Sequence, residues 1–207
     1  MKKIKMLFML VMVLLLAACG TEKEVDLRTG TFEQISYEET NEITNYLKIE
    51  MKNNNLILLE LYPDLAPITV ANFQALVVES FFDGTKFHRV VKGFMIQAGI
   101  SPKDEIAETI KGEFLNNGIE NTLLHERGVI SMARTSASMD SASSQFFIMH
   151  QKSTSLDGDY AAFGKVIAGM DTVDKIANTV VDEPKSMAPK PIVDQVIRSI
   201  RFINIED

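Results

Sequence analysis

Residues 87–99 of this sequence contain an arginine close to methionine, glutamine and phenylalanine residues. Successive side chains of a strand point to opposite faces, so Arg89, Met95 and Gln97 would share one face. A bulge near Gly93 would bring Phe94 onto the same surface. Because a core strand shows only apolar side chains on its inner face, this mixture predicts a pocket. Such a pocket would hold an apolar group next to a charged hydrogen-bond donor.

A second stretch, residues 144–148, divides its side chains in the same way. Gln145 and Phe147 share one face of the expected strand, and Phe146 and Ile148 share the other. One face can therefore contribute to the core while the other contributes to the pocket.

The residue pattern does not indicate a metal site, a hydrolase site or a pair of catalytic carboxylates. His88, His125 and His150 lack the spacing of metal ligands and the chain has one cysteine, so we expect neither a metal nor a cofactor. The serine-rich stretch 135–144 contains no G-x-S-x-G motif and is interpreted as a loop rather than a hydrolase site. Residues 108–114 are interpreted as a strand or loop edge rather than a pair of catalytic carboxylates.

The elements that must position these residues are mostly strands. Alternating apolar residues bounded by turn-forming residues predict strands at 43–50, 56–61, 85–98, 128–134, 144–149, 161–167 and 192–203. Two helices are expected, one from Pro67 to Phe81 and one from Asp171, as its capping residue, to Val180. Many strands with two helices predict a mainly β, antiparallel barrel or sandwich.

Length and charge narrow the class of protein. The chain has 207 residues, 46% of them hydrophobic, which suits one domain with a single core. It carries 21 basic and 28 acidic residues, a formal net charge of −7, so nucleic acid is not expected as a partner. The single cysteine, Cys19, excludes an internal disulfide.

Residues 1–18 have the pattern of a secretory signal peptide. A basic start is followed by an apolar run that is too short for a relaxed transmembrane span. The sequence Leu16-Ala17-Ala18-Cys19-Gly20 resembles the lipobox of bacterial lipoproteins. The resemblance implies that the Cys19 sulfur carries diacylglycerol and becomes the first residue after cleavage, so that acyl chains anchor the protein. An ordinary signal peptide with an incidental cysteine is the alternative.

Residues 19–42 would then be the lipidated N-terminus and an acidic spacer. This spacer is expected to hold the domain, residues 43–207, away from the membrane on its extracytoplasmic face. Phe32, Ile35 and Tyr37 could instead dock on the domain.

Five stretches between residues 43 and 203 resemble the cyclophilins, and they occur in the order of that family. The two signature stretches are Phe87-His88-Arg89-Val90-Val91-Lys92-Gly93-Phe94-Met95-Ile96-Gln97 and Ser144-Gln145-Phe146-Phe147-Ile148. The three further matches are Ala66-Pro-Ile-Thr-Val-Ala-Asn-Phe73, Gly128-Val-Ile-Ser-Met-Ala133 and Leu156-Asp-Gly-Asp-Tyr-Ala-Ala-Phe-Gly164.

The resemblance implies a fold, an activity and a set of site residues. The fold would be a mainly β, eight-stranded antiparallel barrel capped by two α-helices, and the activity that of a peptidyl-prolyl cis/trans isomerase. Arg89 would be the catalytic residue. The proline pocket would comprise Phe94, Met95, Phe147 and Leu156. The peptide backbone would be contacted by Gln97, Ala133 and Gln145, with Tyr160 on the rim.

We therefore expect a cyclophilin-type isomerase in bacterial lipoprotein form. Its partners would be proline-containing exported polypeptides, whose folding it assists outside the cytoplasm, and we expect a monomer. A cyclophilin-like chaperone module that binds proline peptides, with incidental turnover, is the second hypothesis, and a lost arginine or a filled pocket would favour it. A solute-binding lipoprotein is the third, but it would usually need a longer, two-lobed chain.

The sequence departs from the common cyclophilin pattern in a few places. Arg134 stands where many members carry asparagine, and the loop 135–143 is longer than the commonest form. Ser155 stands where many carry tryptophan, and residues 100–109 lack the familiar glycine-rich loop. These departures leave the substrate preference open. The two signature stretches of the family are intact.

Overall fold

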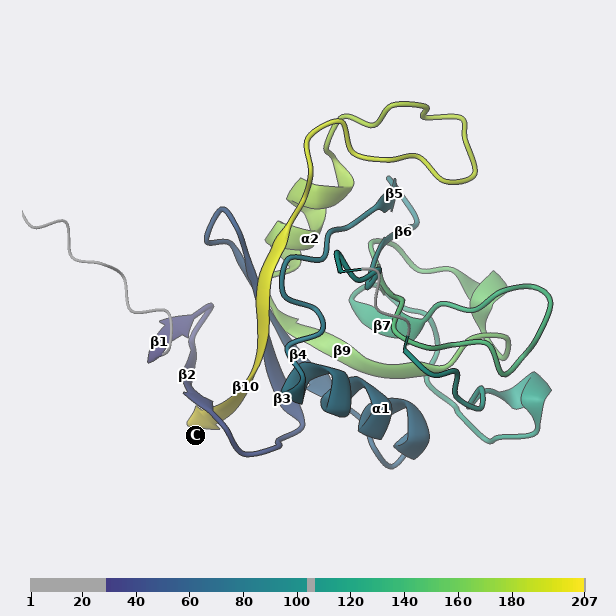
Figure 1. Cartoon of the computed structure of the whole chain (residues 1–207), viewed down its shortest axis with the longest axis horizontal. Coiled ribbons are helices and arrows are strands. Elements are labelled where there is room, and N and C mark those ends of the chain that lie inside the picture. The colour runs from purple at the N-terminus through teal and green to yellow at the C-terminus, as the bar shows by residue number, and fades with distance from the viewer. Residues whose placement is uncertain (1–28, 104–106, 207) are drawn as a thin grey trace, which may run out of the picture.

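The computed structural model describes residues 29–103 and 107–206, which form one sheet and two α-helices (Figure 1). The strands are β1 Thr29–Phe32, β2 Ile35–Thr40, β3 Tyr46–Met51, β4 Leu56–Leu61, β5 Arg89–Val91, β6 Met95–Ala98, β7 Val129–Met132, β8 Phe146–Met149, β9 Ala162–Ala168 and β10 Ile197–Glu206. The α-helices are α1 Pro67–Val78 and α2 Met170–Ala177, and the 3₁₀-helices are η1 Leu115–Asn117 and η2 Thr154–Leu156.

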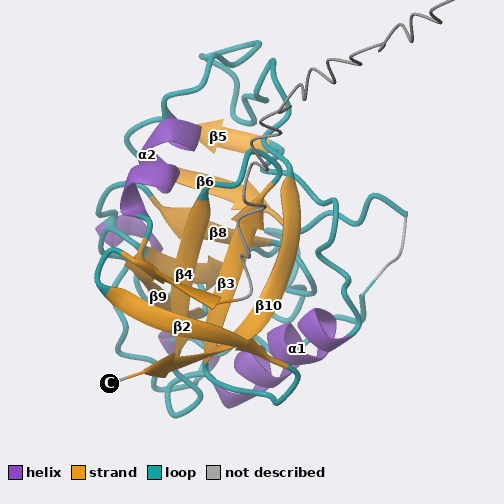
Figure 2. Ribbon diagram, turned by 90° about the vertical axis from the view of Figure 1, so that its left-hand side faces the viewer, coloured by secondary structure: helices purple, strands orange, loops and turns teal. Residues whose placement is uncertain are grey.

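The strands pair antiparallel in the order β1-β2-β10-β3-β4-β9-β7-β8-β6-β5. The sheet curls around the interior, and α1 and α2 lie on opposite sides of it (Figure 2). Near β5 the curled sheet meets the start of β10. There the N–H of Gly84 donates to the carbonyl of Ile197 and the N–H of Phe87 to that of Gln195, both at 3.0 Å. The result is a barrel-like sheet that the strands themselves do not close.

The expected fold class is confirmed, with a ten-stranded open sheet in place of an eight-stranded barrel. The expected strand 85–98 is a hairpin of β5 and β6. Gly93 has a φ of 81°, in the left-handed region that favours glycine, and the N–H of Phe94 donates to the Val91 carbonyl at 3.0 Å. The bulge predicted near Gly93 is therefore a turn. The last strand begins at Ile197 rather than at residue 192, because residues 182–196 form a loop beyond α2.

The folded part begins before residue 43. Strands β1 and β2 form a hairpin that extends the sheet beside β10. Phe32, Ile35 and Tyr37 pack in a small apolar cluster with Leu58 and Ile203. The interpretation of the segment as a spacer is thus wrong for residues 29–40, and the alternative, that these apolar side chains dock on the domain, is confirmed. The expected signal peptide and Cys19 lie outside the described residues.

A buried charge also ties the hairpin to the sheet. Lys48 of β3 is fully buried, and its ammonium pairs with Glu39 of β2 and, at 3.7 Å, with Glu50. The Lys48 nitrogen lies 5.6 Å from the ring centre of Tyr37. A buried ammonium destabilises the fold by several kcal/mol unless carboxylates compensate it. The hairpin therefore supplies both apolar cover and a counter-charge.

The two helices begin differently from each other. Pro67 occupies the first turn of α1, as expected, and the buried carboxylate of Glu113 accepts from the N–H groups of Ile68 and Thr69 at 3.0 and 2.7 Å. Helix α2 is capped by Gly169 rather than by the expected Asp171, whose carboxylate pairs with Lys175 one turn later. Within the described ranges, no helix is long and apolar enough to span a bilayer.

The two faces of β8 contribute to different clusters. Phe146 and Ile148 belong to the main core inside the sheet, where Phe73 of α1 contacts Phe146 edge-on at 5.3 Å between ring centres. Phe147 belongs to a second cluster on the opposite face, together with Met95. The division that strand parity predicted is confirmed.

We expect Tyr37→Ala to lower the free energy of unfolding by about 2–4 kcal/mol, because it removes a 5%-exposed ring from the cluster that joins the hairpin to the sheet. Urea denaturation of the variant measures this change. Glu38→Ala, at an exposed position of the same strand, is the matched control and should change stability little. Equal stabilities for the two variants would show that the Tyr37 ring does not stabilise the fold.

Candidate active site

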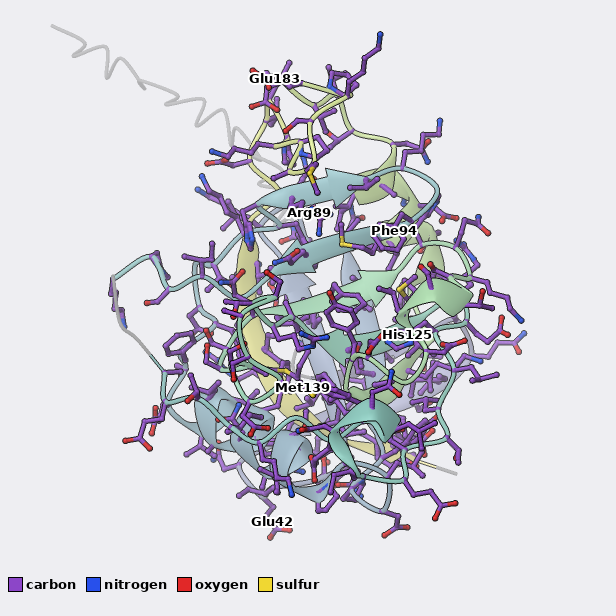
Figure 3. The ribbon with its side chains drawn as sticks, turned by 90° about the vertical axis from the view of Figure 1, so that its right-hand side faces the viewer. Glu42, Arg89, Phe94, His125, Met139 and Glu183 are labelled. Carbon is purple, nitrogen blue, oxygen red and sulfur yellow. The ribbon has the colours of Figure 1, made fainter. Side chains whose placement is uncertain are left out.

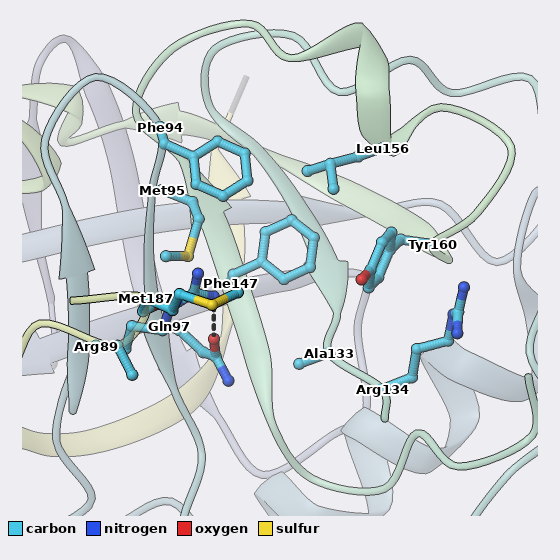
Figure 4. A pocket seen from close by; sticks show the side chains of 11 residues that line it. Arg89, Phe94, Met95, Gln97, Ala133, Arg134, Phe147, Leu156, Tyr160 and Met187 are labelled. Carbon is cyan, nitrogen blue, oxygen red and sulfur yellow. Dashed lines mark hydrogen bonds between the residues drawn. The ribbon is translucent and has the colours of Figure 1, made fainter. Parts of the chain in front are cut away.

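The second cluster forms the floor of an open pocket of about 400 Å³ (Figure 4). The pocket is lined by Arg89, Phe94, Met95, Gln97, Ala133, Arg134, Phe147, Leu156, Tyr160, Met187 and Ala188. All the site residues expected on the globular part except Gln145 therefore meet in one cavity. Gln145 lines an adjoining cavity of about 220 Å³ that shares Gln97, Ala133 and Arg134 with the first.

The register of the sheet places the polar and aromatic groups in one row. Arg89 of β5 is opposite Gln97 of β6, Gln97 is opposite Phe147 of β8, and Phe147 is opposite Ser131 of β7. Opposite residues of antiparallel strands project from the same face. The row therefore runs across four strands from a cation to a buried hydroxyl.

Hydrogen bonds fix the polar end of this row. The Arg89 Nη1 donates to Gln97 Oε1 at 3.1 Å, and the Gln97 Nε2 donates to Gln145 Oε1 at 3.0 Å. The amide oxygen of Gln97 accepts from Arg89 and that of Gln145 accepts from Gln97, so both amides are held in one orientation. The guanidinium is held at the edge of the apolar floor by two amides in series.

The loop beyond α2 holds the other side of Arg89. The Arg89 Nε donates to the Met187 carbonyl at 2.8 Å, and the N–H of Val90 donates to the Pro189 carbonyl at 2.9 Å. In Figure 3 Glu183, from the same loop, lies beyond Arg89 at the end of the molecule. Burial lowers the pKa of the Arg89 guanidinium from its ordinary value, yet an arginine in a protein stays protonated at neutral pH.

The apolar floor rests on a buried histidine. The ring of His125 stacks on that of Phe147 at 5.9 Å between centres, and the ring of Tyr160 contacts Phe147 edge-on at 5.8 Å. His125 Nδ1 lies 3.0 Å from Asp157 Oδ1, and its Nε2 lies 3.1 Å from Ser131 Oγ. Burial lowers the pKa of His125 from 6.5, against the opposing effect of Asp157, so the ring is neutral at neutral pH. His125 supports the pocket, in agreement with the structural role expected for it.

Met187 and Ala188 are pocket residues that no sequence pattern indicates. They come from the loop beyond α2, whose residues show no strand or helix periodicity, and they reach Arg89 only through the tertiary fold. Arg134, a departure from the common cyclophilin pattern, also lines the pocket, although the sequence does not predict it there. Its position directly after Ala133 was the available clue.

The described part of the chain contains no candidate metal centre. Within residues 29–103 and 107–206, no group of three His, Cys, Asp or Glu side chains is arranged to hold a metal ion. The expectation of a site without a metal stays a prediction that a chelator can test.

A scan against family models matches residues 46–201 to the family described as cyclophilin type peptidyl-prolyl cis-trans isomerase/CLD. This match covers the whole pocket. The chain belongs to the cyclophilin-type peptidyl-prolyl cis-trans isomerase family. It is therefore an enzyme, and the cyclophilin resemblance of its sequence is confirmed.

Curated relatives and solved structures agree with this membership. The chain is 46% identical over 164 residues to a peptidyl-prolyl cis-trans isomerase of Acinetobacter baylyi, covering 75% of this chain and 86% of that protein. It is 39% identical to peptidyl-prolyl cis-trans isomerase B of Escherichia coli, covering 72% and 94%. A Cryptosporidium parvum cyclophilin, crystallised in the presence of the dipeptide Ala-Pro, matches with a TM-score of 0.65 and 28% identity, covering 75% and 97%.

We expect Asp182→Ala to lower the kcat/KM of this cyclophilin about two- to tenfold, because Asp182 fixes the loop that holds Arg89. Asp182 Oδ1 accepts from the N–H groups of Glu183 and Lys190, at 2.7 and 2.9 Å, on either side of Met187. Asp182→Asn retains an oxygen at the same place and should restore most of the activity. The measurement is isomerisation of a short X-Pro peptide, with thermal unfolding as a check of the fold. Two variants of equal activity would contradict this role.

Proposed function

We propose that this peptidyl-prolyl isomerase acts on proline-containing exported polypeptides at the outer face of a membrane, with Arg89 as its catalytic residue and no covalent intermediate. Amide resonance opposes rotation about an X-Pro bond with a barrier of about 18–20 kcal/mol, and the uncatalysed step takes tens to hundreds of seconds. The reaction requires only that the twisted amide be stabilised over both planar forms.

Arg89 is suited to stabilise the twisted amide. Resonance delocalises the lone pair of the prolyl nitrogen in both planar isomers, and the lone pair becomes an acceptor only as the bond twists. Arg89 Nε donates to the Met187 carbonyl and one N–H of Nη1 donates to Gln97, which leaves the Nη2 donors and the second N–H of Nη1 for the substrate. A donor that is fixed before reaction needs no reorganisation in the transition state.

The apolar floor is suited to hold the proline ring. Phe94, Met95, Phe147 and Leu156 form one packed cluster beside the guanidinium. A ring immobilised there leaves the preceding carbonyl free to turn. Each tenfold gain in rate requires about 1.4 kcal/mol of transition-state stabilisation, so a few such interactions account for a rate increase of several orders of magnitude.

The observation that carries the proposal is the fixed guanidinium at the edge of an open apolar pocket. The binding-module hypothesis was tied to a lost arginine or a filled pocket, and here Arg89 is oriented on two sides and the cavity is open. The structure therefore favours catalysis over binding with incidental turnover.

The proposed location rests on the sequence before the domain. The pattern of residues 1–18 followed by Cys19 resembles that of a lipidated leader, and the first described strand, β1, follows it in the chain. A domain anchored through Cys19 would meet polypeptides as they leave the membrane.

We expect Arg89→Ala to lower kcat/KM for a short X-Pro peptide by at least about tenfold, because the guanidinium acts on the transition state. Protease-coupled isomerisation measures the rate, and circular dichroism checks that the fold is retained. Arg198→Ala removes an arginine of β10 that pairs with Glu50 and lines neither cavity, and it serves as the matched control. An Arg89→Ala rate equal to that of the wild type would contradict the mechanism.

We expect the native protein to fractionate with membranes and Cys19→Ala to be released or to remain as an uncleaved precursor, because the thiol is the acylation site. Mass spectrometry of the mature N-terminus and membrane fractionation measure both effects. A wild-type mature chain that is free in solution and begins at another residue would contradict the anchor without affecting the isomerase assignment.

A further inference from the structure

Arg134 lies where the two cavities meet. It lines both the pocket and the adjoining cavity, together with Gln97 and Ala133. A peptide that places its proline in the first cavity and extends into the second must pass Arg134. An extended chain advances at most about 3.6 Å per residue, so side chains within two residues of the proline come within reach of it.

The guanidinium of Arg134 is held in position by neutral groups. Its Nε donates to the Asp159 carbonyl at 2.8 Å and its Nη1 to the Thr135 carbonyl at 3.1 Å. Its carbon lies 5.2 Å from the ring centre of Phe114 and 4.9 Å from that of Tyr160, and Figure 4 shows the side chain beside Tyr160 at the pocket margin. These contacts fix the direction of the group while its full charge and the Nη2 donors remain for a ligand.

The surroundings of Arg134 do not supply an anion. Among the residues that the structure describes, no carboxylate forms an ion pair with it. The carboxylate of Asp159, whose carbonyl contacts Arg134, instead accepts from Asn116 Nδ2 at 2.9 Å. Arg89 is a second cation in the same pocket, and the other side chains that line the two cavities are uncharged. A positively charged site is thus set in a protein of net charge −7.

We propose that Arg134 is a specificity-determining residue that selects X-Pro segments carrying an aspartate or glutamate within two residues of the proline. The inference rests on the proposed function of the pocket and names the substrate class. A carboxylate there would accept charge-assisted hydrogen bonds from Nη2 and would relieve the uncompensated charge of the site. A lysine at the same place would meet two like charges.

The test compares peptides that differ only by Glu, Gln or Lys, placed either directly before the proline or one residue earlier. Rates are measured by exchange NMR without a protease, so that no protease preference enters. For the wild type we expect kcat/KM for the Glu peptide to exceed that for the Lys peptide by about two- to fivefold in at least one of the two positions. The ratio should approach one in 1 M salt, where charges are screened within about 3 Å.

Variants at the same position separate charge from shape. Arg134→Lys should keep the preference for Glu, Arg134→Gln should abolish it and Arg134→Glu should reverse it. Lys175→Ala removes one positive charge on α2, where Lys175 pairs with Asp171 outside both cavities, and should leave the ratio unchanged. Using a ratio cancels any uniform change in activity.

Each other result would overturn the proposal. If Arg134→Gln slows the three peptides equally, Arg134 only holds the ring of Tyr160, and the selection is wrong while the isomerase function stands. A wild-type ratio of one between the Glu and Lys peptides at low salt would likewise show that Arg134 does not select acidic substrates. If the wild type turns over none of the peptides, the proposed function fails together with the selection.

Discussion

The site depends on keeping a guanidinium fixed and charged at the edge of an apolar floor. A cation placed there loses part of its hydration, and burial accordingly lowers the pKa of Arg89. The protein compensates with neutral acceptors rather than with a carboxylate: the Met187 carbonyl on one side and the Gln97 amide on the other. A carboxylate partner would hold the donors in a strong ion pair, whereas neutral acceptors leave the positive charge available to a substrate.

The curled sheet explains how one short segment serves both stability and chemistry. Alternate residues of β8 face opposite sides, so Phe146 packs in the main core while Phe147 forms part of the pocket floor. The hydroxyl of Ser131, opposite Phe147 on β7, contacts His125 beneath that ring. Packing of the core therefore sets the position of the floor, because a shift of β8 would move both faces together.

Local patterns in the sequence were sufficient for the parts of the site that lie on strands. Strand parity placed Arg89, Met95 and Gln97 on one face, and the structure agrees because β5 and β6 are paired in a tight hairpin. The same parity argument expected a bulge where Gly93 makes a turn, since a glycine permits both. The acidic composition of residues 29–40 favours a spacer, whereas their apolar residues allow docking, and only the pairing of β2 with the distant β10 decides between the two. Met187 was missed for a related reason, since no local pattern indicates that a loop carbonyl will meet an arginine 98 positions earlier.

In the proposed mechanism Arg89 acts on the twisted amide and not on binding of the peptide. Exchange NMR with the protein in excess over an X-Pro peptide measures the cis/trans interconversion rate on the enzyme and the dissociation constant separately. Arg89→Lys keeps the charge but lacks the planar fork that Gln97 and the Met187 carbonyl orient. For Arg89→Lys we expect a dissociation constant within about threefold of that of the wild type and interconversion slower by at least about tenfold. Wild-type interconversion in the Arg89→Lys variant, with any loss confined to binding, would contradict it.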